Sequence, residues 1–334
     1  MLSRIIFAAV AVAAVATWPR SRTSAAVALA AGSASVLVAG WGVAADTVRA
    51  TGPMLLFLTG ALALSSLAER AGLAERAARV LAAAGKARPG RIYALVCLGS
   101  AVLTCVVSLD GAVVLMVSLV RALSRRCRIP QSPLFLGAVA VANAVSLAVP
   151  EGNPTNLVVM SRLGLSPSAF LGHLLVPGLC AAVLCALVPV RLLSREDHDA
   201  ELPGTETMTM LVPWRIGAQV AGLLATLDRL APPVSLRGGG LAALLAVAGA
   251  TAAAAALANN LPVSASLAAL ATSGPGAYAA LIGLSVGALA TAHGSVATLV
   301  ARDLAGDRRP WARTWAPATA VAVALATLLL WLLS

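Results

Sequence analysis

The sequence predicts an all-α polytopic membrane protein built from inverted repeats, each with a re-entrant hairpin and a broken transmembrane helix. Three observations predict this fold: the composition, a set of polar breaks in apolar runs, and the placement of basic residues. The 334-residue chain is 60% hydrophobic and 11% charged, with a mean hydropathy of +0.91. Soluble domains carry roughly 25% charged residues, so the composition indicates a membrane protein.

The polar breaks interrupt apolar runs at residues 108–111, 151–156, 259–262 and 291–295. Unpaired backbone groups inside a bilayer cost several kcal/mol each. Such breaks therefore persist only where protein or a polar cavity surrounds them. Their occurrence in two similar pairs is typical of a transporter whose broken helices form a binding site near the membrane midplane.

Apolar runs predict full membrane spans at residues 5–18, 24–45, 53–68, 134–162, 170–190, 213–227, 278–301 and 314–333. Two other stretches, at about 92–120 and 239–272, run in to a polar tip and back out. In the first, the return arm from Ala112 to Val120 has nine apolar or uncharged residues. A spanning helix needs about 20 residues, so both stretches are predicted to be re-entrant hairpins.

The basic residues give this path an orientation. If both hairpins return to the side they left, the loops on one face contain 19 of the 24 Lys and Arg residues. An excess of basic residues marks the cytoplasmic face. We therefore expect a multi-pass protein of the cell inner (plasma) membrane with both termini outside, and the net charge of +11 needs no nucleic-acid partner to explain it.

The predicted elements form two similar series. Residues 53–190 give a helix, a hairpin, a broken helix and a closing helix, and residues 213–334 give the same series again. Residues 1–52 are expected to be scaffold helices and residues 191–212 a linker. Because an odd number of crossings separates the two series, the second is predicted to be inverted.

Two acidic residues, Asp110 and Glu151, lie deep in apolar sequence. An ionisable group at membrane depth is a functional-site candidate, and burial favours the neutral form of a carboxyl group. Each is therefore a candidate to couple transport to protons. The alternative is that each caps a half-helix N-terminus, and the two roles are compatible. His293, in the break at residues 291–295, is a third candidate, although a lone histidine is more often a satisfied polar neighbour.

The breaks also carry side chains suited to a neutral polyol-like or an anionic substrate, held by half-helix N-termini and side-chain donors. Interhelical hydrogen bonding is the alternative role for each asparagine. The candidate substrate-binding residues are Asn153, Thr155, Asn156, Asn259, Asn260, Thr291, Gly294 and Ser295. The five cysteines form no CxxC pair, so no zinc or other metal site is expected.

Five motifs, in order along the chain, resemble those of the arsenite efflux permease family (ArsB). They lie at residues 109–115, 146–158, 213–216, 259–262 and 294–299. This family is part of the ion transporter superfamily, with sodium–dicarboxylate symporters and Na+/H+ antiporters. In three respects the chain departs from the pattern: Leu109 replaces an Asn, Glu151 and His293 replace apolar residues, and the second repeat is shortened.

The resemblance implies a scaffold and a transport domain with two hairpins, a homodimer and an elevator motion. It implies efflux of arsenite or antimonite driven by protons, in some members with a soluble ATPase subunit. The family's site residues carry over best onto Asp110, Asn153, Asn156, Asn259, Asn260 and Ser295.

The sequence therefore predicts a secondary active transporter, with arsenite or antimonite efflux as the leading hypothesis. The alternatives are an organic or inorganic anion transporter of the dicarboxylate kind, a Na+/H+ antiporter, and a membrane scaffold that transports nothing. No cofactor is expected beyond a coupling ion, H+ or Na+. An intramembrane enzyme is disfavoured because Asp110, Glu151 and His293 do not have the spacing of a metal site or a catalytic triad.

Overall fold

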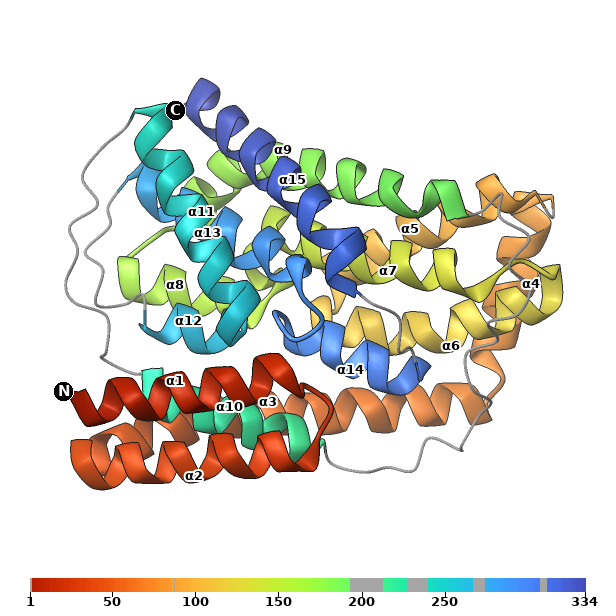
Figure 1. Cartoon of the computed structure of the whole chain (residues 1–334). Helices are drawn as coiled ribbons and strands as arrows, with labels where there is room; N and C mark the ends of the chain where they lie inside the picture. Colours follow the sequence, from red (N-terminus) through yellow and green to blue (C-terminus); the bar gives the residue numbers. More distant parts are fainter. Residues whose placement is uncertain (1, 87, 193–212, 228–239, 267–273, 307–310) are drawn as a thin grey trace.

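The computed structural model describes residues 2–86, 88–192, 213–227, 240–266, 274–306 and 311–334, and the regular structure in those ranges is helical (Figure 1). The helices are α1 (Leu2–Thr17), α2 (Arg22–Ala39), α3 (Trp41–Arg70), α4 (Leu73–Gly85), α5 (Pro89–Val106), α6 (Leu109–Cys127), α7 (Gln131–Val145), α8 (Pro154–Leu163), α9 (Pro167–Leu187), α10 (Trp214–Leu227), α11 (Leu241–Ala258), α12 (Asn260–Ser266), α13 (Pro275–Val286), α14 (Val296–Ala305) and α15 (Trp311–Leu333).

Seven helical segments within the described residues are long and apolar enough to cross a membrane. They are Arg22–Ala39, Trp41–Arg70, Pro89–Val106, Gln131–Ala148, Pro167–Val190, Leu241–Ala258 and Trp311–Leu333. The chain is therefore an all-α polytopic membrane protein, as predicted. The helices within the predicted spans 5–18, 213–227 and 278–301 are shorter than 18 residues, because a break or a helix end interrupts each apolar run.

The helix boundaries correct two details of the predicted path. The helix α3 continues through Pro53 from Trp41 to Arg70, so the expected boundary between residues 52 and 53 falls inside a helix. Proline is tolerated inside membrane helices where neighbouring groups satisfy the freed backbone. The return arm α6 has 19 residues rather than nine, because good helix formers follow Val120 and the helix ends only at Arg128, whose φ is 53°.

Both predicted hairpins begin with an 18-residue helix, α5 in the first and α11 in the second. Each of these helices is itself long enough to cross a membrane, so re-entrance stays a prediction. The return arm α12 is described as far as Ser266. The rest of that arm and residues 193–212 of the expected linker lie outside the described residues.

The two predicted series correspond to α3 to α9 and α10 to α15. In Figure 1, α8 and α12 extend to one side of the centre, and α6 and α14 extend to the other. In each of these four helices the end nearest the centre is the N-terminus, and it lies at one of the four breaks. An inverted repeat would give this arrangement, and the inversion itself stays a prediction.

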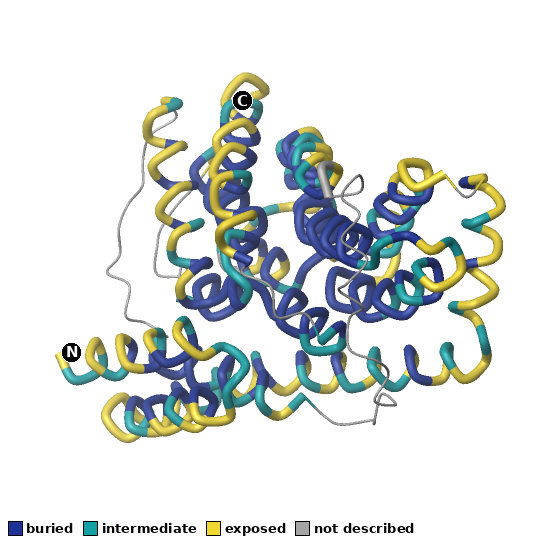
Figure 2. Tube along the Cα trace, turned by 45° about the vertical axis from the view of Figure 1, so that its right-hand side comes forward, coloured by how far each residue is buried: buried dark blue, intermediate teal, exposed yellow. Residues whose placement is uncertain are grey.

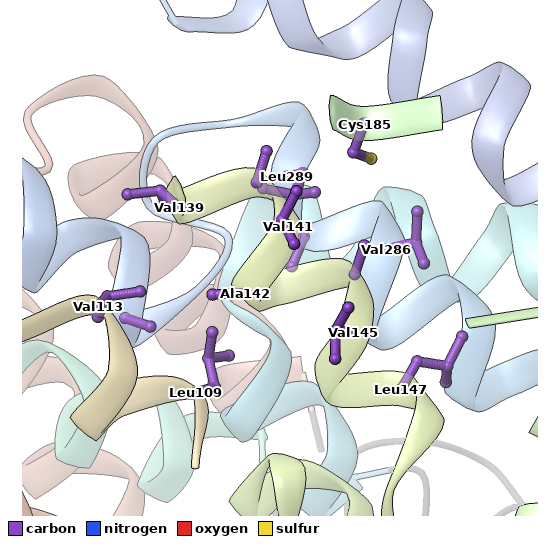
Figure 3. Close-up of a cluster of buried hydrophobic side chains, with 14 of the residues drawn as sticks. Leu109, Val113, Val139, Val141, Ala142, Val145, Leu147, Cys185, Val286 and Leu289 are labelled. Atoms are coloured by element: carbon purple, nitrogen blue, oxygen red, sulfur yellow. The ribbon is translucent and has the colours of Figure 1, made fainter. Parts of the chain in front are cut away.

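The central helix is α7, which leads into the break at residues 151–156. We call this the first break, and the break at residues 291–295 the second break. The whole segment Gln131–Ala148 is buried, although it has the composition of a membrane span. In Figure 3, α7 runs between Leu109 and Val113 of α6 and the side chains of Val286 and Leu289. The first break is thus held among other helices, where its backbone groups find partners within the protein.

A second, small core joins α1, α2 and α10. It consists of Ala11, Val15, Ala28, Ala31 and Leu223. Small residues allow the close approach: a Cβ added to Gly222 would lie 2.2 Å from the carbonyl oxygen of Ala28. Figure 2 shows these helices as a layer beside the main core. We call α1, α2 and α10 the N-terminal bundle.

Candidate functional site

The tips and breaks of the two series meet at one small cavity. Its lining comes from α3, the start of α6, the break before α8, the start of α12 and the start of α14. The lining residues are Met54, Leu109, Asp110, Asn153, Pro154, Thr155, Asn260, Leu261, Ser295 and Val296. The volume open to the centre of a water molecule is about 10 Å³, so the cavity admits about one water molecule or a small ion.

The first hairpin tip brings Asp110 to this cavity. Asp110 lies in the first turn of α6 and is 5% exposed. The tip reverses sharply: the φ of Ser108 is 132°, and a Cβ added to Gly111 would lie 2.6 Å from Cγ1 of Val107. Within the described residues, the Asp110 carboxylate has no hydrogen-bond or ion-pair partner. A buried carboxyl group without a partner is poised to bind a proton or a cation.

The first break presents Asn153 and Thr155. The backbone N–H of Thr155 donates to Oδ1 of Asn153 at 3.0 Å, so Asn153 caps α8. Among the described residues, Nδ2 of Asn153 and Oγ1 of Thr155 are buried without a hydrogen-bond partner. Buried polar groups are normally paired, so these two atoms mark a place for a ligand or an ordered water.

Asn156, in contrast, holds the first break together and does not line the cavity. Its Nδ2 donates to the carbonyl oxygens of Ser146 and Val149 at 2.7 and 3.1 Å, groups that the break has freed from the helical ladder. Ser285 of α13 donates to Oδ1 of Asn156 at 3.5 Å, which links the two broken helices. The structure therefore shows Asn156 in a positioning role, and its contact with substrate stays a prediction.

Asn259 plays the corresponding part at the second hairpin. Its φ is 72°, its Oδ1 accepts from the N–H of Leu261 at 3.2 Å, and its Nδ2 donates to the carbonyl oxygen of His293 at 2.8 Å. The N–H of Asn260 donates to the carbonyl oxygen of Gly294 at 2.8 Å. These bonds tie the tip to the second break, so Asn259 is outside the cavity while Asn260 lines it.

Two other predicted ligands also support the second break. The hydroxyl of Thr291 donates to the carbonyl oxygen of Ala256 at 2.6 Å. A Cβ added to Gly294 would lie 2.2 Å from the carbonyl oxygen of Ala288, so this position has no room for a side chain. Neither residue lines the cavity, because the break folds Thr291 against α11 and Gly294 against the short helix Gly287–Ala290 that follows α13.

Ser295, like Asn260, is a polar side chain of the second series at the cavity wall. It occupies the N-cap position of α14 but makes no side-chain bond to the first turn. Its Oγ is buried without a partner among the described residues. The sequence did not single out Met54, which also lines the cavity, because an apolar residue in an apolar run carries no signal of a site.

The structure separates Glu151 and His293 from the site. Glu151 is exposed on the single-turn helix Pro150–Gly152, so its expected burial is wrong: apolar flanks do not bury a side chain that a turn directs outward. His293 is 6% exposed, and its Nε2 has no partner within the described ranges. Neither residue lines the cavity, so the structure gives no support to their predicted coupling roles.

The cavity combines one acidic group with several helix N-termini. Asp110 is the one charged residue in the described lining. The helices α6, α8 and α14 begin there, and the N-cap residues of α6 and α14 make no side-chain cap bond. Free N–H groups at a helix start favour an anion. Among the described residues, no group of three His, Cys, Asp or Glu side chains could hold a metal ion.

A model of the citrate transporter family (CitMHS) matches residues 5–333. The chain belongs to the citrate transporter family. Membership places it among membrane transporters and not among enzymes. The match does not show the expected membership of the arsenite efflux permease family.

The chain also resembles the inner membrane protein YbiR of Escherichia coli (strain K12). The two are 33% identical over 84 residues, which make up 25% of this chain and 23% of that protein. The similarity thus covers about a quarter of each of the two proteins and bears on membrane location more than on substrate.

Replacing Asn156 with alanine should destabilise the protein. The carbonyl oxygens of Ser146 and Val149 would lose their donor, and a buried group left without a partner costs about 1–3 kcal/mol. We expect a lower melting temperature for Asn156→Ala in detergent. Thr17→Ala, which removes an exposed hydroxyl bond to Ala13, is the matched control. Equal melting temperatures for the two variants would contradict the role given to Asn156.

Proposed function

We propose that this protein is a secondary active transporter of small organic anions of the citrate kind. The cavity at Asp110, Asn153 and Ser295 would hold the substrate and the coupling ion. The observation that carries this proposal is the convergence of uncapped helix starts, partnerless polar atoms and one buried carboxyl group on a single cavity. Family membership supports the chemical class.

Helix starts supply the attraction for a carboxylate. The first-turn N–H groups of α6 and α14 have no side-chain acceptor at the cap, and the helix dipole adds partial positive charge at the same place. The hydroxyl groups of Thr155 and Ser295 and the amide of Asn153 add donors without adding net charge. Such a lining binds anions without an intramembrane Arg or Lys.

The cavity must enlarge to accept such a substrate. Its volume of about 10 Å³ is far below the 300–1,000 Å³ typical of small-molecule pockets. The lining comes from helices of both series, so the wall formed by α6 and α14 must separate from the wall formed by α8 and α12. Movement of this kind gives access to the site from one side of the membrane at a time.

Asp110 is the proposed coupling group. It is buried at the cavity and has no charged partner among the described residues, so binding an anion beside an ionised carboxylate would be unfavourable. Protonation, or a bound Na+, removes this repulsion. Binding of substrate and cation together follows, and this favours cotransport of an organic anion with H+ or Na+.

Arsenite efflux is a second candidate, favoured by a specific observation. Residues 109–115, 259–262 and 294–299 carry motifs similar to those of arsenite permeases, and the cavity is small with uncharged donors at Asn153, Thr155 and Ser295. A neutral trihydroxy species suits such a lining without charge compensation. Residence in the inner membrane, the homodimer, the soluble ATPase partner and the outward position of both termini remain predictions from sequence.

The purified protein in liposomes should accumulate radiolabelled citrate or a C4-dicarboxylate when a pH or Na+ gradient is imposed. Empty liposomes are the control. If only arsenite moves, the second candidate replaces the first. If no tested solute moves and none raises the melting temperature, the protein is a scaffold that transports nothing, and the proposal fails.

Asp110→Asn should abolish gradient-driven accumulation and leave exchange of labelled for unlabelled substrate, since an amide cannot take up and release a proton. Glu151→Gln is the matched control, and we expect it to accumulate substrate at the native rate because Glu151 is exposed and away from the cavity. Both variants are measured in liposomes after a melting-temperature check. Accumulation by Asp110→Asn at the native level would exclude Asp110 as the coupling group.

A further inference from the structure

The helix α14 reaches from the cavity to a cluster of charges. It begins directly after Ser295, which lines the cavity, and has 10 residues. At 1.5 Å per residue it is about 15 Å long. Near its C-terminal end lies Asp303, whose carboxylate forms ion pairs with Arg20 and Arg215. One short helix therefore joins the cavity wall to an ionic contact.

Both basic partners of Asp303 belong to the N-terminal bundle. Arg20 lies in the turn between α1 and α2, with its Nε 2.9 Å from Oδ1 of Asp303. Arg215 lies in the first turn of α10 and also donates to the carbonyl oxygen of Pro19 at 2.7 Å. Gln219 of α10 donates to the same carbonyl oxygen at 2.9 Å. The bundle thus presents Arg20 and Arg215 as one preformed receptor for a carboxylate.

Other contacts at this end of α14 come from the main core. A guanidinium nitrogen of Arg121 in α6 donates to the carbonyl oxygen of Leu304. The guanidinium of Arg302 lies 5.3 Å from the ring centre of Trp311, at the start of α15. These contacts join α14 to the body that carries the cavity, whereas Asp303 joins it to the bundle with its separate small core.

The Asp303 contact has the properties of a reversible link. The side chains of Asp303, Arg20 and Arg215 are 29%, 33% and 20% exposed, so water can solvate them when they part. Ion pairs that water can reach in this way contribute little net stability. Within the bundle, however, Arg20 and Arg215 are held near each other, and without the carboxylate their like charges would repel. The ion pairs of Asp303 can therefore break, and while they are formed they hold α14 against the N-terminal bundle.

We propose that Asp303 is a positioning residue: paired with Arg20 and Arg215, it is a latch that holds α14 against the N-terminal bundle and keeps the cavity closed. Release of the latch lets α14 and its Ser295 end move relative to the bundle, which opens the cavity. The biological role of this latch rests on the proposed transport function. The inference goes beyond that function in naming a contact about 12 Å along α14 from Ser295 that sets how often the site opens.

The test measures how fast a thiol placed in the cavity reacts. Ser295→Cys supplies the thiol, N-ethylmaleimide is the reagent, and peptide mass spectrometry separates position 295 from the five native cysteines. No substrate is present, so the result does not depend on which solute the protein carries. Adding Asp303→Asn should raise the rate at position 295 by about fivefold.

Two controls separate release of the latch from general loosening. Asp46→Asn removes a carboxylate that pairs with Arg49 within α3, at 3.1 Å, and should leave the rate at position 295 unchanged. Native Cys185 is fully buried in the main core, so its labelling should stay slow in every variant. An equal rise at Cys185, or an equal effect of Asp46→Asn, would overturn the proposal.

The bundle side of the latch gives an independent check. Arg20→Gln and Arg215→Gln should each raise the rate at position 295, and combining Arg20→Gln with Asp303→Asn should add little to Asp303→Asn alone. These variants also serve if Asp303→Asn folds poorly. An unchanged rate in both arginine variants would overturn the latch. Failure to transport citrate would overturn the proposed function and leave the latch standing.

Discussion

The backbone groups at the four helix breaks need hydrogen-bond partners inside the protein, and this need determines how the helices are arranged. A broken helix inside a membrane leaves N–H and C=O groups that lipid cannot satisfy. At the first break, Asn156 donates two hydrogen bonds to freed carbonyl oxygens. At the second break, Asn259 forms hydrogen bonds both within its own hairpin tip and to the break. The N-termini of α6 and α14 face the cavity without a side-chain cap bond, and so they are available to a ligand.

The polar residues at the breaks have two roles, stabilising the backbone and lining the cavity, and the need for backbone partners decides which residue has which role. Side chains that reach a freed carbonyl oxygen, such as Asn156 and Thr291, donate their hydrogen bonds to it and stabilise the breaks. Those that reach none, such as Thr155 and Ser295, keep a buried polar atom without a partner in the described part of the chain. Asp110 is the one charge in the described cavity lining. Residues that line the cavity and residues that stabilise the breaks are therefore of the same kinds and lie at neighbouring positions.

Much of this arrangement could be predicted from the sequence, and the rest depends on contacts distant along the chain. The breaks interrupt the hydrophobic pattern itself, so their positions, and that of Asp110 at a tip, follow from local sequence. Whether an asparagine binds a carbonyl or a ligand depends on its partner: Asn259 meets residue 293, and nothing near Asn259 specifies that contact. The exposure of Glu151 depends likewise on the direction of a turn, and the length of α6 on helix formers beyond the apolar run.

The central claim is that an anion binds where the breaks converge. Hydrogen–deuterium exchange of the protein in detergent, with and without saturating citrate, tests it most directly. We expect slower exchange at the first turns of α6 and α14, because their N–H groups would donate to the bound carboxylates. Unchanged exchange at both helix starts, together with citrate-dependent protection elsewhere in the chain, would contradict binding at this cavity.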